Sequence, residues 1–169
     1  QNFAWPNGTH LCVVEIDQDT GKVEVQRYVA VDDFGNVLNP MIVDGMTHGG
    51  VAQGVGQALS EQAVYTDDGQ LLSGSLMDYA LPSADMFPMM ELDRTTTPSP
   101  SNPIGVKGAG EAGTIAASPA VMNAVIDAIA HLGVKHMDMP ATSEKVWRAM
   151  QDAKEARRAE RAAARSQGS

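Results

Sequence analysis

The 169-residue sequence has little cysteine and little positive charge. Its single cysteine, Cys12, excludes an internal disulfide and a cluster of thiolate metal ligands. Cys12 lies between Leu11 and Val13, and a cysteine in such surroundings is most often a small buried apolar side chain. The 12 Lys and Arg residues are outnumbered by 21 Asp and Glu residues, and the net charge of −9 argues against nucleic acid or an anionic membrane as a partner.

Long apolar runs are also missing. The sequence has no segment of about eighteen apolar residues and no signal-peptide pattern, so we expect no membrane insertion and a cytoplasmic protein. No other histidine, cysteine or carboxylate stands at metal-ligand spacing to His48 or His136, so we predict no metal-ligating side chains. Because the chain starts with Gln1 and an extended pattern begins within ten residues, we expect it to be one part of a larger protein.

The apolar pattern that is present predicts the α+β class, with an N-terminal β-hairpin followed by helices. Residues 10–17 and 22–32 alternate apolar and polar side chains on either side of a turn, which is typical of a hairpin. Strict alternation in the second strand places Val25 on one face and Tyr28 on the other. Weaker extended segments are expected at residues 71–79 and 89–97.

Three helices are expected in the rest of the chain. Apolar residues at helical spacing predict one within residues 41–65. For the second, Ser118 is a good N-cap with Pro119 at the first helical position, and Gly133 ends the helix. A third begins at residues 142–143.

The composition changes at residue 151. Residues 151–169 consist mainly of Ala, Arg, Glu and Lys and contain almost no large apolar side chain, so they offer little to bury. We therefore divide the chain into residues 1–150 and a polar tail, helical or frayed, at residues 151–169.

A first glycine-rich segment occupies residues 45–56, inside a predicted helix. Each interior glycine costs a helix about 1 kcal/mol relative to alanine, so Gly54 and Gly56 need a reason. Tight packing against another helix and close approach of a ligand are both open. Gln53 and Gln57 lie one turn apart and present their amides on one face, toward a polar ligand or water.

A second glycine-rich segment, residues 105–113, contains four glycines around Glu111. Composition alone favours a surface turn, although a carboxylate on such a loop can also be placed for chemistry. Residues 108–113 fit the dinucleotide pattern G-x-G-x-x-G, but the three prolines in residues 95–103 exclude the buried strand that this fingerprint requires. Pro119 also argues against a helix that starts at Gly113.

Both segments resemble motifs of the molybdenum hydroxylases. Residues 49–59 are similar to the family's G-G-x-A-Q-G-x-G-Q-A-L segment, and residues 105–111 are similar to its G-x-K-G-x-G-E loop. Both motifs belong to the molybdopterin-binding large subunit of the xanthine dehydrogenase, aldehyde oxidase and aerobic carbon monoxide dehydrogenase family. Further resemblance to the C-terminal part of that subunit is found at residues 78–82, 97–103 and 138–142.

The resemblance runs from about Gly8 to Met150 and implies the C-terminal part of a larger molybdopterin-binding domain. Glu111 matches the family's catalytic glutamate, the general base that accepts a proton from the molybdenum-bound hydroxyl. The implied cofactor is molybdopterin with molybdenum, in its cytosine dinucleotide form. The cofactor-binding residues expected from the matching motifs are Gln53, Gly54, Gly56, Lys107, Gly108 and Gly110.

The resemblance also implies an oxidative hydroxylation in which water supplies the oxygen. Electrons would leave through iron–sulfur clusters and FAD on partner subunits, and the remainder of the large subunit would complete the site. The carbon monoxide dehydrogenase branch looks closest, with aldehyde or N-heterocycle hydroxylation as the alternative; Cys12 does not match the copper-binding cysteine of that branch. The isolated chain is expected to be inactive, and a non-catalytic cofactor-holding or assembly module is the hypothesis from another class.

Overall fold

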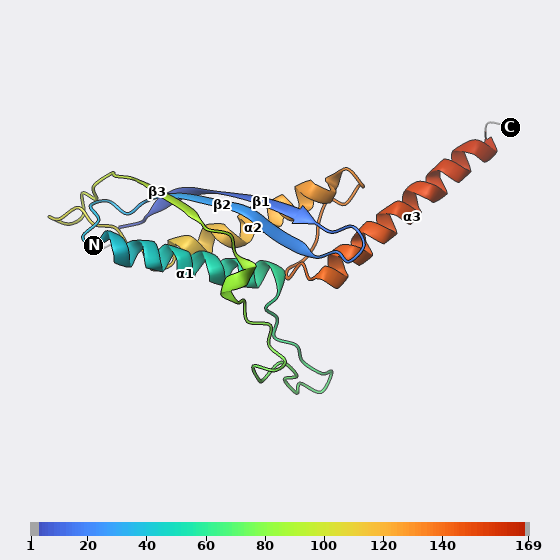
Figure 1. Ribbon diagram of the computed structural model, residues 1–169, viewed down its shortest axis with the longest axis horizontal. Coiled ribbons are helices and arrows are strands. Elements are labelled where there is room, and N and C mark those ends of the chain that lie inside the picture. Colours follow the sequence, from blue (N-terminus) through green and yellow to red (C-terminus); the bar gives the residue numbers. More distant parts are fainter. Residues whose placement is uncertain (1–3, 168–169) are drawn as a thin grey trace.

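The computed structural model describes residues 4–167 and combines a three-stranded mixed sheet with three long helices in that range (Figure 1). The predicted α+β class is confirmed. A short 3-10 turn at Ala84–Met86 precedes the third strand. The strands are β1 (Asn7–Ile16), β2 (Val23–Asp33) and β3 (Glu91–Thr95), and the helices are α1 (Pro40–Leu59), α2 (Ala112–Ala130) and α3 (Ser143–Gln167).

The sheet has the order β1-β2-β3, with β1 antiparallel and β3 parallel to β2. The predicted hairpin is confirmed, and its turn is closed by the Asp17 carboxylate, which accepts hydrogen bonds from the backbone N–H groups of Asp19 and Thr20. The extended segment expected within residues 89–97 is present as β3. The strand expected at residues 71–79 is wrong, because turns centred on Ser75 occupy that segment.

A β-bulge changes the faces of β2. Val13 pairs with Arg27 and Val14 with Val25, so Gln26 is an extra residue in the register. One inserted residue moves every following side chain to the opposite face of a strand. Tyr28 is therefore buried on the same side as Val25, and the expectation that they lie on opposite faces is wrong.

Helix α1 begins at Pro40. The Asn39 side chain accepts a hydrogen bond from the Ile42 N–H at 3.2 Å, and Pro40 takes the first helical position. The helix was predicted within residues 41–65, and it ends at Leu59.

Helix α2 starts seven residues earlier than predicted. It begins at Ala112, and the Ser118 hydroxyl donates to the Gly54 carbonyl instead of capping a helix. Pro119 therefore lies inside α2, where it leaves the Ile115 carbonyl without its helical donor. Ile115 is 69% exposed, so solvent can reach that region of the helix. Pro119 therefore does not exclude the dinucleotide-binding fingerprint. The fingerprint is still excluded, because residues 96–111 form no strand.

The core lies between the sheet and the two glycine-containing helices. In Figure 1, α1 and α2 run side by side along the sheet, and α2 packs on β1. By length and composition α2 could cross a membrane, yet a core helix meets the same test and α2 supplies much of this core. The buried apolar side chains are those of Val25, Tyr28, Ala30, Phe34, Val51, Val55, Ala58, Ala117, Val121, Val125, Ile129, Ala141, Val146 and Met150.

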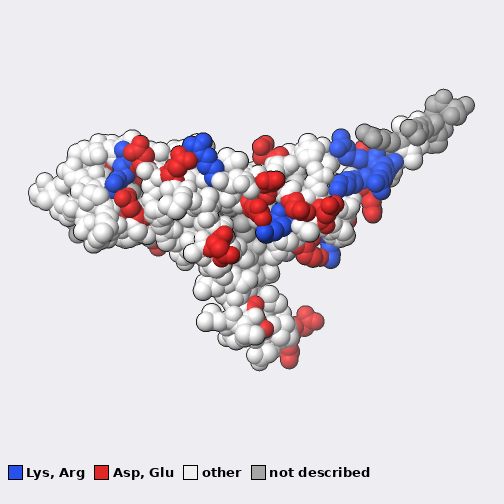
Figure 2. Space-filling model, in the orientation of Figure 1, with Lys and Arg blue, Asp and Glu red and all other residues white. Residues whose placement is uncertain are grey.

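Two segments leave this core. The segment between α1 and the 3-10 turn, residues 60–83, projects as a long loop, and α3 extends beyond the end of the sheet (Figure 1). Val146 and Met150 hold the start of α3, whereas residues 155–160 are exposed. Figure 2 shows Lys and Arg gathered along α3, while Asp and Glu are spread over the rest of this face.

Candidate cofactor site

Helices α1 and α2 make close contact through small residues. A Cβ atom added to Gly54 would lie 2.6 Å from the Ala117 Cβ and 2.9 Å from the Thr114 carbonyl oxygen. A Cβ on Gly113 would lie 2.6 Å from the Thr47 carbonyl oxygen. Only glycine lets the two backbones approach this closely. Helix packing, one of the two explanations that the sequence left open, therefore accounts for Gly54.

Hydroxyl groups of α2 reinforce this contact in a repeating arrangement. The Thr114 hydroxyl lies 3.0 Å from the Gly50 carbonyl and 3.3 Å from the Gln53 Oε1. One turn later the Ser118 hydroxyl makes the same pair of contacts with the Gly54 carbonyl and the Gln57 Oε1. Gln53 is exposed, and the contact through its oxygen leaves its NH2 group as the end that can donate outward.

Gly56 is also explained by packing. It is buried, and a Cβ there would meet the Glu61 carboxylate and lie 2.8 Å from the Pro82 Cγ. The chain that leaves α1 therefore folds back over this position. A cofactor contact at Gly54 or Gly56 stays a prediction, and neither glycine needs one to explain its presence.

The open glycines of α1 are Gly45 and Gly49. A Cβ added to either would meet no described atom within 4 Å. Gly45, Gly49 and Gln53 follow one another at intervals of four residues, so they form one stripe along the helix. Gly54 and Gly56 were predicted as cofactor residues from the matching motif, and no local pattern shows which side of α1 faces α2.

The loop that contains the predicted base is joined to the end of β2. Gly35 and Val106 form an isolated β-bridge, and the Lys107 N–H donates to the Phe34 carbonyl at 2.9 Å. Gly35 and Gly105 have φ values of +64° and +69°, a conformation that favours glycine. These backbone contacts fix residues 105–107 against the turn that follows β2.

The Lys107 side chain has a partner inside the chain. Its Nζ lies 2.9 Å from the Asp33 Oδ1, and the two side chains are 11% and 2% exposed. Burial alone would raise the pKa of Asp33, but hydrogen bonds from Thr97, the Gly35 N–H and Lys107 lower it far below its ordinary value. The predicted contact between Lys107 and the cofactor is therefore untested, and the structure gives Lys107 a role in holding the loop.

Past Lys107 the loop is open. The Gly108 N–H donates to the Ala4 carbonyl at 3.1 Å, and a Cβ at Gly108 would have its nearest atom at 3.9 Å. At Gly110 the nearest atom would be the Met46 Cε, at 3.7 Å. Both predicted cofactor glycines are exposed and leave room for another molecule.

Glu111 lies directly before α2. It occupies the N-cap position, its side chain is exposed, and it makes no capping hydrogen bond. The contacts on both sides of it are made with α1, since Met46 approaches Gly110 and Thr47 approaches Gly113. The structure therefore places the segment around Glu111 against α1, the helix that also carries the first motif.

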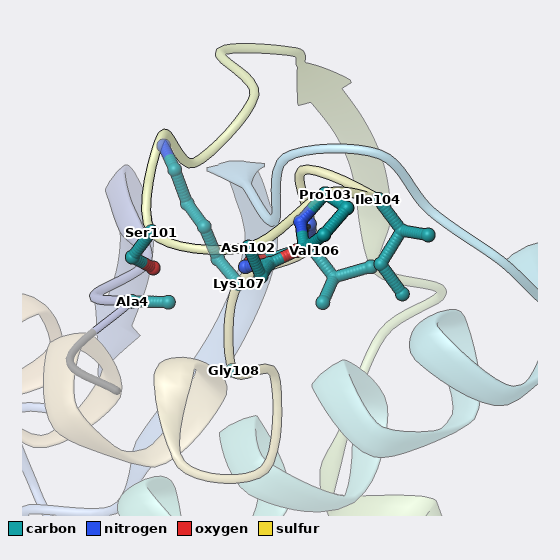
Figure 3. A pocket seen from close by; sticks show the side chains of 8 residues that line it. All are labelled: Ala4, Ser101, Asn102, Pro103, Ile104, Val106, Lys107 and Gly108. Atoms are coloured by element: carbon teal, nitrogen blue, oxygen red, sulfur yellow. Dashed lines mark hydrogen bonds between the residues drawn. The ribbon is translucent and has the colours of Figure 1, made fainter. Parts of the chain in front are cut away.

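A surface hollow of about 580 Å³ lies beside this site. It runs along the loop and is shown in Figure 3, with Gly108 below the side chains of Asn102, Val106 and Lys107. Glu111 does not line it. Between residues 4 and 167 no group of three or more His, Cys, Asp or Glu side chains is arranged to hold a metal ion. A metal at this site would therefore depend on a cofactor and not on ligands from the described side chains.

Comparison with known proteins identifies the family. Residues 1–88 match the model of the molybdopterin cofactor-binding domain. The chain belongs to this family. The sequence is 46% identical, over 89% of the chain, to the carbon monoxide dehydrogenase large chain of Hydrogenophaga pseudoflava. It is also 46% identical, over 85% of the chain, to the nicotine 6-hydroxylase large subunit of Paenarthrobacter nicotinovorans.

Solved structures of this family have the same fold. A copper- and molybdenum-containing carbon monoxide dehydrogenase superposes with a TM-score of 0.85 and 39% identity over 88% of this chain and 19% of that chain. The chain spans 19% and 18% of the two relatives that it matches. The predicted resemblance to the molybdenum hydroxylase large subunit is confirmed.

Proposed function

We propose that the chain supplies a cofactor-binding face and the general base Glu111 to a molybdenum hydroxylase. The observation that carries this proposal is the meeting of the open stripe on α1 with the loop that ends at Glu111. A cofactor lying on the stripe would have the Glu111 carboxylate at its edge. This function requires the remainder of a large subunit, because the chain spans less than a fifth of its relatives.

The open stripe fits an extended, polar cofactor. Gly45 to Gln53 covers about 12 Å of helix at 1.5 Å per residue. Gly45 and Gly49 place no side chain in the way, Gln53 can donate from its amide, and Gly108 and Gly110 leave backbone open beside Glu111. We infer molybdopterin as the ligand of this face, and we propose its cytosine dinucleotide form from the resemblance of the two motifs.

The chemistry assigned to this chain is proton transfer. When bound, the molybdenum cofactor supplies the centre that oxidises the substrate carbon, with water as the source of oxygen. The Glu111 carboxylate accepts the proton released in this step. Because Glu111 is exposed in this chain, the cofactor, the substrate and the rest of the large subunit have to exclude water around it. We propose iron–sulfur and FAD subunits as the path for electrons.

Two substrate classes follow from the relatives. Carbon monoxide is our first candidate, since two carbon monoxide dehydrogenase large chains match at 46% and 40% identity. An N-heterocycle is the second, because nicotine 6-hydroxylase matches at the same 46%. Parallel assays of the purified enzyme with carbon monoxide and with a pyridine-type substrate separate the two. A cytoplasmic location stays a prediction.

The experiment that tests the proposed function is turnover of the complete purified assembly in ¹⁸O-labelled water, with analysis of molybdenum and of the pterin nucleotide. We expect bound molybdenum, a cytosine nucleotide and, with an N-heterocyclic substrate, one labelled oxygen in the product. Molybdenum without any hydroxylation would favour the non-catalytic cofactor-holding module. An assembly free of molybdenum and pterin would contradict the proposed function.

A further inference from the structure

We propose that the buried ion pair between Asp33 and Lys107 is a positioning device for Glu111. The pair joins two segments 74 residues apart, the end of β2 and the loop before α2. Its consequence for catalysis rests on the proposed function of Glu111 as the base. Asp33 and Lys107 act through the loop and are positioning residues.

The first step of the argument is the burial of the pair. The Asp33 Oδ1 accepts from the Lys107 Nζ at 2.9 Å and from the Gly35 N–H at 2.8 Å, so one carboxylate holds both the turn after β2 and the loop. Removing one member of such a pair leaves a buried charge without a partner. The pair therefore opposes any movement of Lys107 away from Asp33.

The second step is the freedom of the residues that follow. Only Gly108, Ala109 and Gly110 separate Lys107 from Glu111, and the two glycines have open surroundings. Glycine has the largest conformational freedom of any residue, so this segment does not fix its own path. The position of Glu111 is therefore set mainly by the two ends of the segment.

The third step concerns those two ends. On the far side of Glu111 the chain is fixed by helix packing, because Gly113 lies against the Thr47 carbonyl of α1. On the near side Lys107 is the last side chain with a buried partner before Glu111, and the Gly108 N–H adds a bond to the Ala4 carbonyl. Without the ion pair, only backbone contacts would hold this end of the segment, so Glu111 could move more freely.

The test uses the complete enzyme with Lys107→Met, Lys107→Arg and the double variant Asp33→Asn/Lys107→Met, which leaves no unpaired charge if the single variant fails to fold. Arg27→Met is the matched control, because it breaks the exposed Arg27–Glu91 pair on the same strand, away from the loop. The measurements are molybdenum content, kcat and KM, and amide hydrogen exchange of residues 105–112.

For Lys107→Met we expect kcat per bound molybdenum to fall on the order of 10²-fold, since a displacement of about 1 Å can cost that much. Molybdenum content and KM should change far less, and residues 105–112 should exchange faster. Lys107→Arg should restore part of kcat because the charge is kept, and Arg27→Met should change none of these quantities.

Unchanged exchange of residues 105–112 in Lys107→Met would overturn the proposal, whatever the activity. Loss of molybdenum with normal kcat per remaining molybdenum would also overturn it, in favour of a direct contact between Lys107 and the cofactor. A separate Glu111→Gln variant shows whether Glu111 is the base. If that variant keeps full activity, the proposed function fails, and hydrogen exchange still decides whether the ion pair positions the loop.

Discussion

Helix α1 is packed on the face that meets α2 and open on the face that carries Gly45, Gly49 and Gln53. Gly50 and Gly54 lie against α2, where a Cβ would come within 3.0 and 2.6 Å of α2 atoms, whereas Gly45 and Gly49 have no described neighbour within 4 Å of that position. The same residue type therefore meets two different requirements within one helix. The packed face fixes the crossing with α2, and the open face lies beside the loop that carries Glu111.

The largest loss of stability is expected on the packed face of α1. Gly54→Leu places a side chain against Ala117 and the Thr114 carbonyl, so we expect a loss of about 3 kcal/mol, the upper end of typical overpacking costs. The measurement is the thermal unfolding of the cofactor-free protein. Unfolding at the wild-type temperature would show that α1 and α2 can separate freely, which would remove the difference between the two faces of α1.

The same substitution on the open face should affect cofactor binding alone. Gly49→Leu adds no contact within the chain and gains up to about 1 kcal/mol of helix propensity, so the cofactor-free protein should be as stable as the wild type or slightly more stable. The added side chain covers the proposed cofactor face. We expect bound molybdenum to fall about tenfold, which corresponds to 1.4 kcal/mol of lost contact. Full molybdenum content in Gly49→Leu would place the cofactor elsewhere.

A smaller effect is expected at the anchor of the loop. Hydrogen bonds lower the pKa of Asp33 in the folded state, so the unfolded chain takes up the proton at higher pH than the folded one. Stability from Asp33 is therefore complete above the ordinary carboxyl pKa of about 3.9 and is lost progressively as the pH falls from there through the lowered pKa of the folded state. Asp33→Asn should flatten the loss of stability below about pH 4 in acid-unfolding curves. An unchanged curve would mean that Asp33 makes no such contribution.

The smallest effect is expected at α3, where the contrast between packed and open regions repeats. Met150 is buried and residues 155–160 are exposed, with Arg157 donating to the His131 carbonyl at 3.0 Å. Deleting residues 152–169 should change the free energy of unfolding by less than about 0.5 kcal/mol. Met150→Ala is the control and should cost about 2–5 kcal/mol. A large loss of unfolding free energy on deletion would show that the tail packs against another part of the protein.

Local patterns were enough to predict several elements of this fold. The hairpin and the end of α2 before Gly133 each depend on residues close together in the sequence. The two glycine-rich motifs were enough to predict the family. Their meeting in space follows from the contact between α1 and α2, which no local pattern contains.

The remaining features depend on partners distant in the sequence. The bulge at Gln26 is defined only by pairing with β1, and the interior position of Pro119 is tolerated because Ile115 is exposed. Which glycines of α1 are open depends on how α2 crosses it. The Asp33–Lys107 pair joins positions 74 residues apart, and its one local signal is a pair of acidic residues at the end of an apolar strand.

The central claim is that Glu111 is the base beside a cofactor held on the open face of α1. The most direct test is the rate of the assembled enzyme with Glu111→Gln, measured per bound molybdenum, with the exposed Glu155→Gln on α3 as control. We predict a loss of about 10²- to 10⁴-fold, typical of removing a general base, with molybdenum retained and the control unaffected. An unchanged rate with molybdenum bound would contradict the account.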